Sequence, residues 1–214
     1  RFCACSMSYT VQPRRRCASG RGDKERKNTK MKHFLIVVDM QKDFVDGALG
    51  TQEAMQIVPK VTDKILGFDG RVFATLDTHT SDYLQTAEGR SLPVPHCIKG
   101  TPGWMLNDEI AAALEQKDTT KVEKLTFGSV LLPRLLYQAA NGEPFTVELV
   151  GLCTDICVVS NALILKANFP EMEISVDSAC CAGLCLHLLH LDGAAEDVLL
   201  SLCRPLVNKV CHGA

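Results

Sequence analysis

Residues 145 to 166 read FTVELV, GLCTDIC and VVSNALILK, and this stretch decides the fold that we predict. The run 145–150 is apolar and β-branched, which is typical of a strand, and residues 158–166 are typical of a helix. The short turn between them places Cys157 in the first helical turn, with Thr154 as the predicted N-cap. A strand, a tight turn and a helix are the basic unit of an α/β fold.

Cys157 is a candidate nucleophile because of its place at the start of this helix. Unpaired backbone N–H groups and the positive end of the helix dipole are expected to lower the pKa of a thiol there. The same N–H groups are suited to holding an oxyanion. The alternative is a small apolar side chain that packs the helix onto the sheet, since most free cysteines are buried and inert. The local sequence favours neither interpretation.

The rest of the chain alternates between strand and helix patterns. Apolar and β-branched runs predict further strands at 34–38, 71–77, 119–122 and 173–177. Between them we expect a helix that opens at Pro59, a helix capped by Asn107 and a helix that begins at Ser129. This alternation predicts a three-layer α/β/α fold on a doubly wound, mainly parallel sheet. No clear sixth strand follows, so we expect the last strand to be atypical or missing.

The composition of the 214 residues, with 46% hydrophobic and 22% charged, is that of one globular domain. The net charge is −2, but residues 1–30 hold nine Lys or Arg against two acidic residues, so the remainder is acidic. An acidic body argues against a nucleic-acid partner, and no apolar run is long enough to span a membrane. The eleven cysteines suit reduced cytosolic thiols better than a disulfide framework, so we expect a cytoplasmic protein.

The two ends of the chain differ from its centre. Residues 1–30 are expected to be a disordered basic leader, and residues 31–214 a single domain with an atypical tail over 184–214. An Arg-rich leader is also typical of a transit peptide, but its two acidic residues and its lack of an amphipathic pattern weaken that interpretation. We expect the native domain to start at Met31, with the leader non-native or translated from upstream.

Three polar residues stand at the predicted ends of strands or just beyond them: Asp39, Lys124 and Cys157. The carboxyl ends of parallel strands meet at one edge of a sheet, so we expect these side chains to lie together. A lysine beside the sulfur stabilises a thiolate, and an aspartate can accept the thiol proton and return it to a leaving amine. Singly, Asp39 is equally suited to capping a helix and Lys124 to a solvated surface. Together the three residues predict a cysteine amidase.

From about residue 31 to residue 183 the chain resembles the isochorismatase-like cysteine hydrolases, and within them the nicotinamidases. Five motifs in the family's order carry the resemblance: VVDMQKDF at 37–44, DTH at 77–79, PHCIKGTPG at 95–103, EKLTFGS at 123–129 and GLCTDIC at 151–157. The first and the last motif are fairly specific on their own, and the five in order are very specific.

The resemblance implies a catalytic triad of Asp39, Lys124 and Cys157. It also implies a cis peptide bond between Leu152 and Cys153. The oxyanion hole that it implies is formed by the backbone N–H groups of Cys153 and Cys157.

The resemblance further implies a metal site at Asp77, His79 and His96, with Glu88 as a candidate fourth ligand or, alternatively, a solvated loop carboxylate. A carboxylate and two imidazoles suit one divalent ion, with Zn²⁺ expected and Fe²⁺ or Mn²⁺ as alternatives. Nicotinamidases often carry a substrate-stacking tryptophan where this chain has Pro93. The predicted substrate contacts are Phe44, Gln41, Trp104 and Phe127.

These residues predict a metal-dependent cysteine amidohydrolase that converts nicotinamide to nicotinate and ammonia. A related hydrolase acting on another small amide or on isochorismate is the alternative within enzymes. A non-enzymatic metal or thiol-redox protein using Cys153 and Cys157 is the alternative of another class, although their spacing is not the C-x-x-C of redox sites. We expect a small-molecule substrate, no nucleic-acid or membrane partner, and a homo-oligomer.

Overall fold

The computed structural model describes residues 31–183 and 209–211. The predicted leader and most of the predicted atypical tail therefore lie outside the described residues. The elements in chain order are β1 (Lys32–Val38), α1 (Lys42–Val45), α2 (Gln52–Gly67), β2 (Arg71–Asp77), η1 (Tyr83–Gln85), α3 (Ala87–Ser91), α4 (Asp108–Leu114), β3 (Thr119–Lys124), α5 (Leu132–Ala140), β4 (Phe145–Leu152), η2 (Thr154–Val158), α6 (Val159–Asn168), β5 (Ile174–Ala182) and β6 (Lys209–Cys211).

The strands form one sheet in the order β3-β2-β1-β4-β5-β6, and every neighbouring pair is parallel. The chain moves from β1 outward to β3 and then returns to β4 on the other side of β1, which makes the sheet doubly wound. The predicted fold class is therefore confirmed. A sixth strand, which the sequence did not reveal, is present as the three-residue β6 beside β5.

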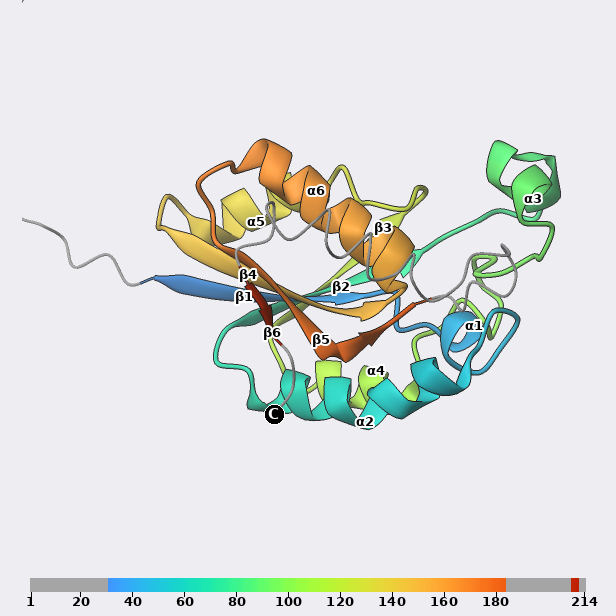
Figure 1. The fold of residues 1–214 in the computed structure, drawn as a ribbon, viewed down its shortest axis with the longest axis horizontal. Coiled ribbons are helices and arrows are strands. Elements are labelled where there is room, and N and C mark those ends of the chain that lie inside the picture. Colours follow the sequence, from blue (N-terminus) through green and yellow to red (C-terminus); the bar gives the residue numbers. More distant parts are fainter. Residues whose placement is uncertain (1–30, 184–208, 212–214) are drawn as a thin grey trace, which may run out of the picture.

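Helices cover both faces of the sheet, with α5 and α6 on one face and α2 and α4 on the other (Figure 1). The central strand β1 is buried on both faces because its apolar side chains alternate. Leu35 and Val37 join the core beneath α2 and α4, whereas Phe34, Ile36 and Val38 join the core beneath α5 and α6. The continuous apolar run that predicted this strand is thus explained by burial on both faces.

The prediction that Pro59 opens a helix is wrong, because Pro59 lies inside α2. The helix begins at Gln52, where the Thr51 side chain accepts a hydrogen bond from the Ala54 N–H at 3.0 Å. Pro59 is exposed, so the carbonyl group that its missing N–H leaves free can bond water. The buried stripe of α2 stabilises the helix across the proline; it consists of Ala54, Ile57, Val58, Val61 and Ile65.

Of the two other predicted helix starts, the one at Asn107 is confirmed and the one at Ser129 is three residues too early. Asn107 does cap α4, since its side-chain oxygen accepts from the backbone N–H groups of Glu109 and Ile110. Helix α5 begins at Leu132 rather than at Ser129, and the Ser129 hydroxyl oxygen accepts from the Leu132 N–H.

The short elements α1, η1 and α3 gather beyond the carboxyl ends of the strands, at the edge where β1 leads into α1 (Figure 1). This is the edge at which open parallel sheets bind ligands. Within the described ranges, no helix has the length and apolar character needed to cross a membrane.

Candidate active site

Asp39 directly follows β1 and is completely buried, with a left-handed backbone φ of +47°. Its Oδ1 accepts a hydrogen bond from the Thr75 hydroxyl at 2.7 Å, and its Oδ2 lies 2.7 Å from the Lys124 ammonium nitrogen. Burial raises the pKa of the Asp39 carboxyl, and the Lys124 charge works in the opposite direction. A carboxylate with a raised pKa is suited to accepting a proton and giving it back.

Lys124 is the last residue of β3, and its side chain is 1% exposed. Its Nζ lies 2.7 Å from Asp39 Oδ2, 2.9 Å from Asp77 Oδ1 and 3.5 Å from Cys157 Sγ. Burial disfavours the ammonium charge, but the neighbouring carboxylates and the sulfur more than offset this and hold the pKa of Lys124 above its ordinary value. The lysine therefore carries its charge into the site and connects three polar groups.

Cys157 lies in the turn η2, next to Lys124, and is 4% exposed. The expectation that the helix start lowers its pKa is wrong. Burial raises the pKa of the Cys157 thiol well above its ordinary value, and the Asp39 carboxylate adds to this while Lys124 opposes it. The ammonium is shared with two carboxylates and cannot offset the loss of water around a thiolate. The resting thiol is neutral, so it needs a base when it reacts.

The backbone before Cys157 has the cis peptide bond between Leu152 and Cys153 that the resemblance implied. The Cys153 carbonyl accepts from the Ile156 N–H at 3.2 Å and from the Val158 N–H at 3.0 Å, which closes a π-helical turn. Thr154 is not the N-cap, because it lies inside this turn and Cys153 precedes it. The Thr154 hydroxyl is buried and makes no capping hydrogen bond.

Cys153 and Cys157 are both free and buried. Burial also raises the pKa of the Cys153 thiol, well above its ordinary value. A buried, protonated thiol lacks the reactivity of a redox cysteine. The burial of both thiols disfavours the redox alternative, and the main chain of Cys153 remains as the candidate contribution of this residue.

Asn161 holds the turn that carries Cys157 in place, a role that the sequence analysis missed. Its Nδ2 donates to the Cys157 carbonyl at 2.8 Å, and its Oδ1 accepts from the Ser129 N–H at 2.9 Å. The side chain is completely buried. It therefore fixes the loop after Lys124 against the turn that carries Cys157. The signal that could have found it is a polar amide next to an apolar run within the predicted helix.

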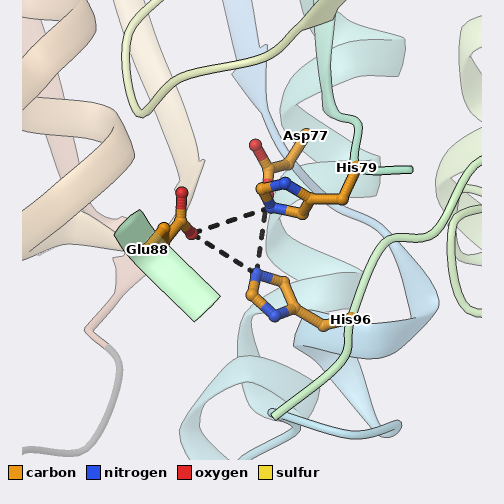
Figure 2. Close-up of side chains that lie close together, drawn as sticks. All are labelled: Asp77, His79, Glu88 and His96. Atoms are coloured by element: carbon orange, nitrogen blue, oxygen red, sulfur yellow. Dashed lines mark ion pairs between the residues drawn. The ribbon is translucent and has the colours of Figure 1, made fainter. Parts of the chain in front are cut away.

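Asp77, His79, Glu88 and His96 converge so that one ligand atom from each lies within 4.8 Å of the others (Figure 2). Asp77 and His79 come from the end of β2, and Glu88 approaches from α3. His79 Nε2 lies 2.9 Å from Asp77 Oδ2 and 3.7 Å from Glu88 Oε1, while His96 Nε2 lies 3.6 and 3.9 Å from the same two atoms. The structure thus brings the predicted fourth ligand together with the other three.

The chemistry of this group fits a divalent metal ion. His79 Nε2 is buried and has no hydrogen-bond partner of good geometry, although a carboxylate is near. His96 Nδ1 lies 2.8 Å from the Val94 carbonyl, a contact that leaves Nε2 as the free ring nitrogen and fixes the ring. Two imidazoles and two carboxylates are a donor set that suits Zn²⁺, Fe²⁺ or Mn²⁺.

The rings of Tyr83 and Phe44 pack against the two histidines. The Tyr83 ring centroid lies 4.6 Å from that of His79 and 5.0 Å from that of His96, and the Phe44 ring lies 5.3 Å from His96. The Tyr83 hydroxyl donates to the Leu92 carbonyl at 2.9 Å. Sequence reasoning missed Tyr83, because a tyrosine in a loop has no pattern that marks it as a support for metal ligands.

One pocket is lined both by Cys157 and by residues of the cluster of Asp77, His79, Glu88 and His96. Its lining includes Cys157, Cys153, Asp77, Glu88, His96, Phe44, Phe127, Leu49, Leu92 and Ile156. Two of the four predicted substrate contacts, Phe44 and Phe127, are therefore part of its wall. The other two are not: Trp104 donates its indole N–H to the Thr78 hydroxyl, and the side-chain amide of Gln41 bonds main-chain groups. Leu49, Leu92 and Ile156 are wall residues that the sequence did not single out.

Comparison with known proteins gives the following relatives. The model of the isochorismatase domain matches residues 33–190. An isochorismatase family protein PncA of Bacillus subtilis is 29% identical over 146 residues, which are 62% of this chain and 78% of that protein. The crystal structure of a nicotinamidase/pyrazinamidase PncA from Bacillus subtilis has a TM-score of 0.71 at 24% identity, over 86% of this chain and 100% of that one. The Pyrococcus horikoshii pyrazinamidase, solved with zinc, has a TM-score of 0.66 at 24% identity, over 85% and 99%.

Proposed function

We propose that this chain, which belongs to the isochorismatase family, is a cysteine amidohydrolase that converts nicotinamide to nicotinate and ammonia. One observation carries the proposal: Cys157 lines the same pocket as Asp77, Glu88 and His96, which are three of the four residues of the histidine-carboxylate group. A nucleophile and a metal-binding group that face each other suit a flat carboxamide with a ring nitrogen at its far side. The apolar walls offered by Phe44 and Phe127 suit an aromatic ring.

Asp39 and Cys157 would carry out the covalent steps. Asp39 accepts the thiol proton as Cys157 Sγ attacks the amide carbon, so that a C–S bond forms and the C–N bond then breaks. Asp39 returns that proton to the departing nitrogen, which leaves as ammonia. In the second half, Asp39 takes a proton from water as the water oxygen attacks the thioester carbon, so that a C–O bond forms and the C–S bond breaks. The acid is released, and the proton returns from Asp39 to the sulfur. The neutral resting thiol and the raised pKa of the carboxyl support this division of roles.

Lys124 and the turn at Cys153 would stabilise the charges that develop. The Lys124 ammonium, 3.5 Å from Cys157 Sγ, offsets the negative charge on sulfur when the proton leaves. The backbone N–H groups of Cys153 and Cys157 would donate to the oxyanion of the tetrahedral intermediate. The π-helical turn that the Cys153 carbonyl closes supports this role, since it keeps the N–H groups of Cys153 and Cys157 at the start of one helix.

Asp77, His79 and His96 would hold one divalent ion, with Glu88 as a fourth ligand. A bound ion supplies a Lewis-acidic position for the ring nitrogen of the substrate. The buried, unpartnered Nε2 of His79 supports this assignment. The zinc bound by the Pyrococcus horikoshii pyrazinamidase, which shares the fold, supports Zn²⁺ as the ion.

The test is ammonia release from nicotinamide, with nicotinate identified by mass spectrometry, in the presence and absence of a chelator. We expect release of both products and its loss on chelation, with recovery on addition of Zn²⁺. A parallel assay measures pyruvate release from isochorismate and ammonia release from aliphatic amides. Turnover of isochorismate or of an aliphatic amide without turnover of nicotinamide would overturn the proposed substrate.

A further inference from the structure

We infer that Gln41 is a positioning residue that holds Asp77 in place for both the lysine and the histidines. The parallel ladder between β1 and β2 has its last residue pair at Val38 and Thr75, and its last backbone bond runs from Asp39 N–H to the Thr75 carbonyl at 3.2 Å. Continuing the ladder would pair the N–H and C=O of Asp77 with the backbone that follows Asp39. The chain turns away instead, and the Gln41 N–H bonds the Asp39 carbonyl at 2.7 Å.

The side-chain amide of Gln41 replaces the missing strand. Its Oε1 accepts from the Asp77 N–H at 2.7 Å, and its Nε2 donates to the Asp77 carbonyl at 2.8 Å. The same Nε2 donates to the Trp104 carbonyl at 2.8 Å. Because Gln41 is fully buried and its amide is engaged on both sides, it has a role inside the protein in place of the predicted contact with substrate.

A primary amide of this length is needed at the position. It offers a donor and an acceptor to the two backbone groups of Asp77, which a carboxylate cannot do because it only accepts. Methionine has a similar length and no strong hydrogen-bonding group, so it would leave the N–H and C=O of Asp77 buried and unpaired.

Holding the Asp77 backbone in place also fixes the positions of its two carboxylate oxygens. Oδ1 lies 2.9 Å from the Lys124 ammonium, whereas Oδ2 lies 2.9 Å from His79 Nε2 and 3.6 Å from His96 Nε2. One carboxylate thus serves the lysine and the proposed metal group at once, and a small rotation of its backbone would move both oxygens. Gln41 fixes that backbone on the side that faces β1, where the ladder between β1 and β2 has ended. This inference rests on the proposed metal group, since it concerns how a ligand of that group is held.

The experiment measures the zinc affinity of the metal-free protein by competition with a chromophoric chelator, for wild type, Gln41→Glu and Gln41→Met. We expect both variants to bind zinc about 10- to 100-fold more weakly, as is typical when a partner of a metal ligand is lost. Gln41→Glu is the sharper variant, because an added carboxylate near a cation would strengthen binding if charge alone decided the affinity. The matched control is Gln116→Glu in the exposed turn that follows α4, where the same exchange should leave the affinity unchanged.

The thermal unfolding midpoint, measured on the same samples, separates positioning from mere folding. Folded variants with wild-type zinc affinity would overturn the inference, even if their midpoints fall. If Gln41→Glu does not fold, the neutral Gln41→Met decides by the same criterion. Wild-type protein that binds zinc but releases no ammonia from nicotinamide would refute the proposed reaction and leave Gln41 testable, whereas wild-type protein without zinc affinity would refute both.

Discussion

Among the residues that the structure describes, two lysines each bridge two carboxylates beside a cysteine, and one of these two clusters faces the pocket described above. The Lys124 cluster consists of Asp39, Asp77, Lys124 and Cys157; the Lys64 cluster consists of Lys64, Glu148, Asp177 and Cys180. In both clusters the ammonium nitrogen lies 2.7 to 2.9 Å from the carboxylate oxygens. The residue types and the distances are therefore nearly the same.

The clusters differ in their burial and in what surrounds them. The side chain of Lys124 is 1% exposed at the carboxyl edge of the sheet, whereas that of Lys64 is 27% exposed where α2 packs against β4 and β5. Cys157 opens onto the pocket, and Cys180 is not part of its lining. Water screens the Lys64 cluster, which fastens a helix to the sheet, but not the Lys124 cluster. A lysine, two carboxylates and a thiol thus become a candidate catalytic group only where burial and a pocket coincide.

The largest difference should appear when each cluster loses its thiol. Cys157→Ala removes the nucleophile and should lower kcat/KM for nicotinamide by about 10⁴-fold or more. Cys180→Ala removes a thiol that also neighbours an aspartate and a lysine, and should leave kcat/KM within about twofold, because no reacting group contacts it. Ammonia release under substrate-limited conditions measures both values. A Cys157→Ala protein that retains activity would refute the mechanism. A large loss of kcat/KM in Cys180→Ala would show that the two clusters do not differ in their role in catalysis.

Removal of the lysines should separate the clusters next. Lys124→Met leaves Asp39 buried without a counter-charge and takes the ammonium away from Asp77, so we expect a loss of about 3 to 5 kcal/mol in the free energy of unfolding. The same variant should lose about 10³-fold in kcat/KM, because the thiolate has no opposing charge. Lys64→Met should cost about 1 kcal/mol and leave kcat/KM nearly unchanged. Urea unfolding and steady-state kinetics measure these effects, and equal losses of stability in the two variants would contradict the assigned difference in burial.

The sequence predicts the Lys124 cluster because its members stand at or just after the ends of strands that patterning reveals. Parallel topology then brings Asp39, Lys124 and Cys157 to one edge without further information. Three residues of the proposed metal group, Asp77, His79 and His96, are predicted by the same logic or by a family motif. The sequence does not predict the Lys64 cluster, since Lys64 lies in the last turn of a helix and its contacts depend on how α2 crosses two strands.

Other features of the site escaped the sequence because they depend on packing. The pKa of Cys157 is set by its burial, which the helix-dipole argument ignored. The Gln41 amide bonds backbone groups because β1 turns away from β2, and the Trp104 indole bonds the Thr78 hydroxyl, so neither side chain lines the pocket. Pro59 lies inside its helix because the buried stripe on the opposite side stabilises α2 more than the proline disrupts it.

A third prediction concerns Asn161, which holds the backbone of Cys157 in the Lys124 cluster. Asn161→Asp keeps an acceptor for the Ser129 N–H but loses the donor to the Cys157 carbonyl, so the turn that carries Cys157 should loosen. We expect kcat to fall about tenfold with little change in KM, since about 1 kcal/mol per lost hydrogen bond is typical. The control is Asn168→Asp, because Asn168 makes the same bond to the carbonyl four residues earlier on an exposed surface. A loss of kcat in Asn168→Asp as large as in Asn161→Asp would argue against a specific role.

The smallest expected effect is the pH dependence of the Lys64 cluster. Burial works against the charge of Asp177, but the Lys64 ammonium holds the pKa of this carboxyl below its ordinary value. A carboxyl with a lowered pKa stabilises the fold fully above its unfolded pKa of about 3.9, and this stabilisation is lost as pH falls through the folded value. Burial likewise works against the charge of Lys64, whose pKa the two carboxylates raise above 10.5. Its contribution is therefore complete below that value and is lost only in strong alkali.

The difference in unfolding free energy between wild type and Lys64→Met should therefore stay near its value of about 1 kcal/mol from pH 5 to pH 9. Below about pH 4 it should shrink as Asp177 is protonated. Urea unfolding of both proteins at pH 7, 5 and 3.5 measures this, and raised salt at pH 7 should reduce the difference because the pair is partly exposed. A difference that persists at pH 3.5 and in salt would show that the aliphatic part of Lys64 stabilises the fold by packing and that the ion pairs contribute nothing.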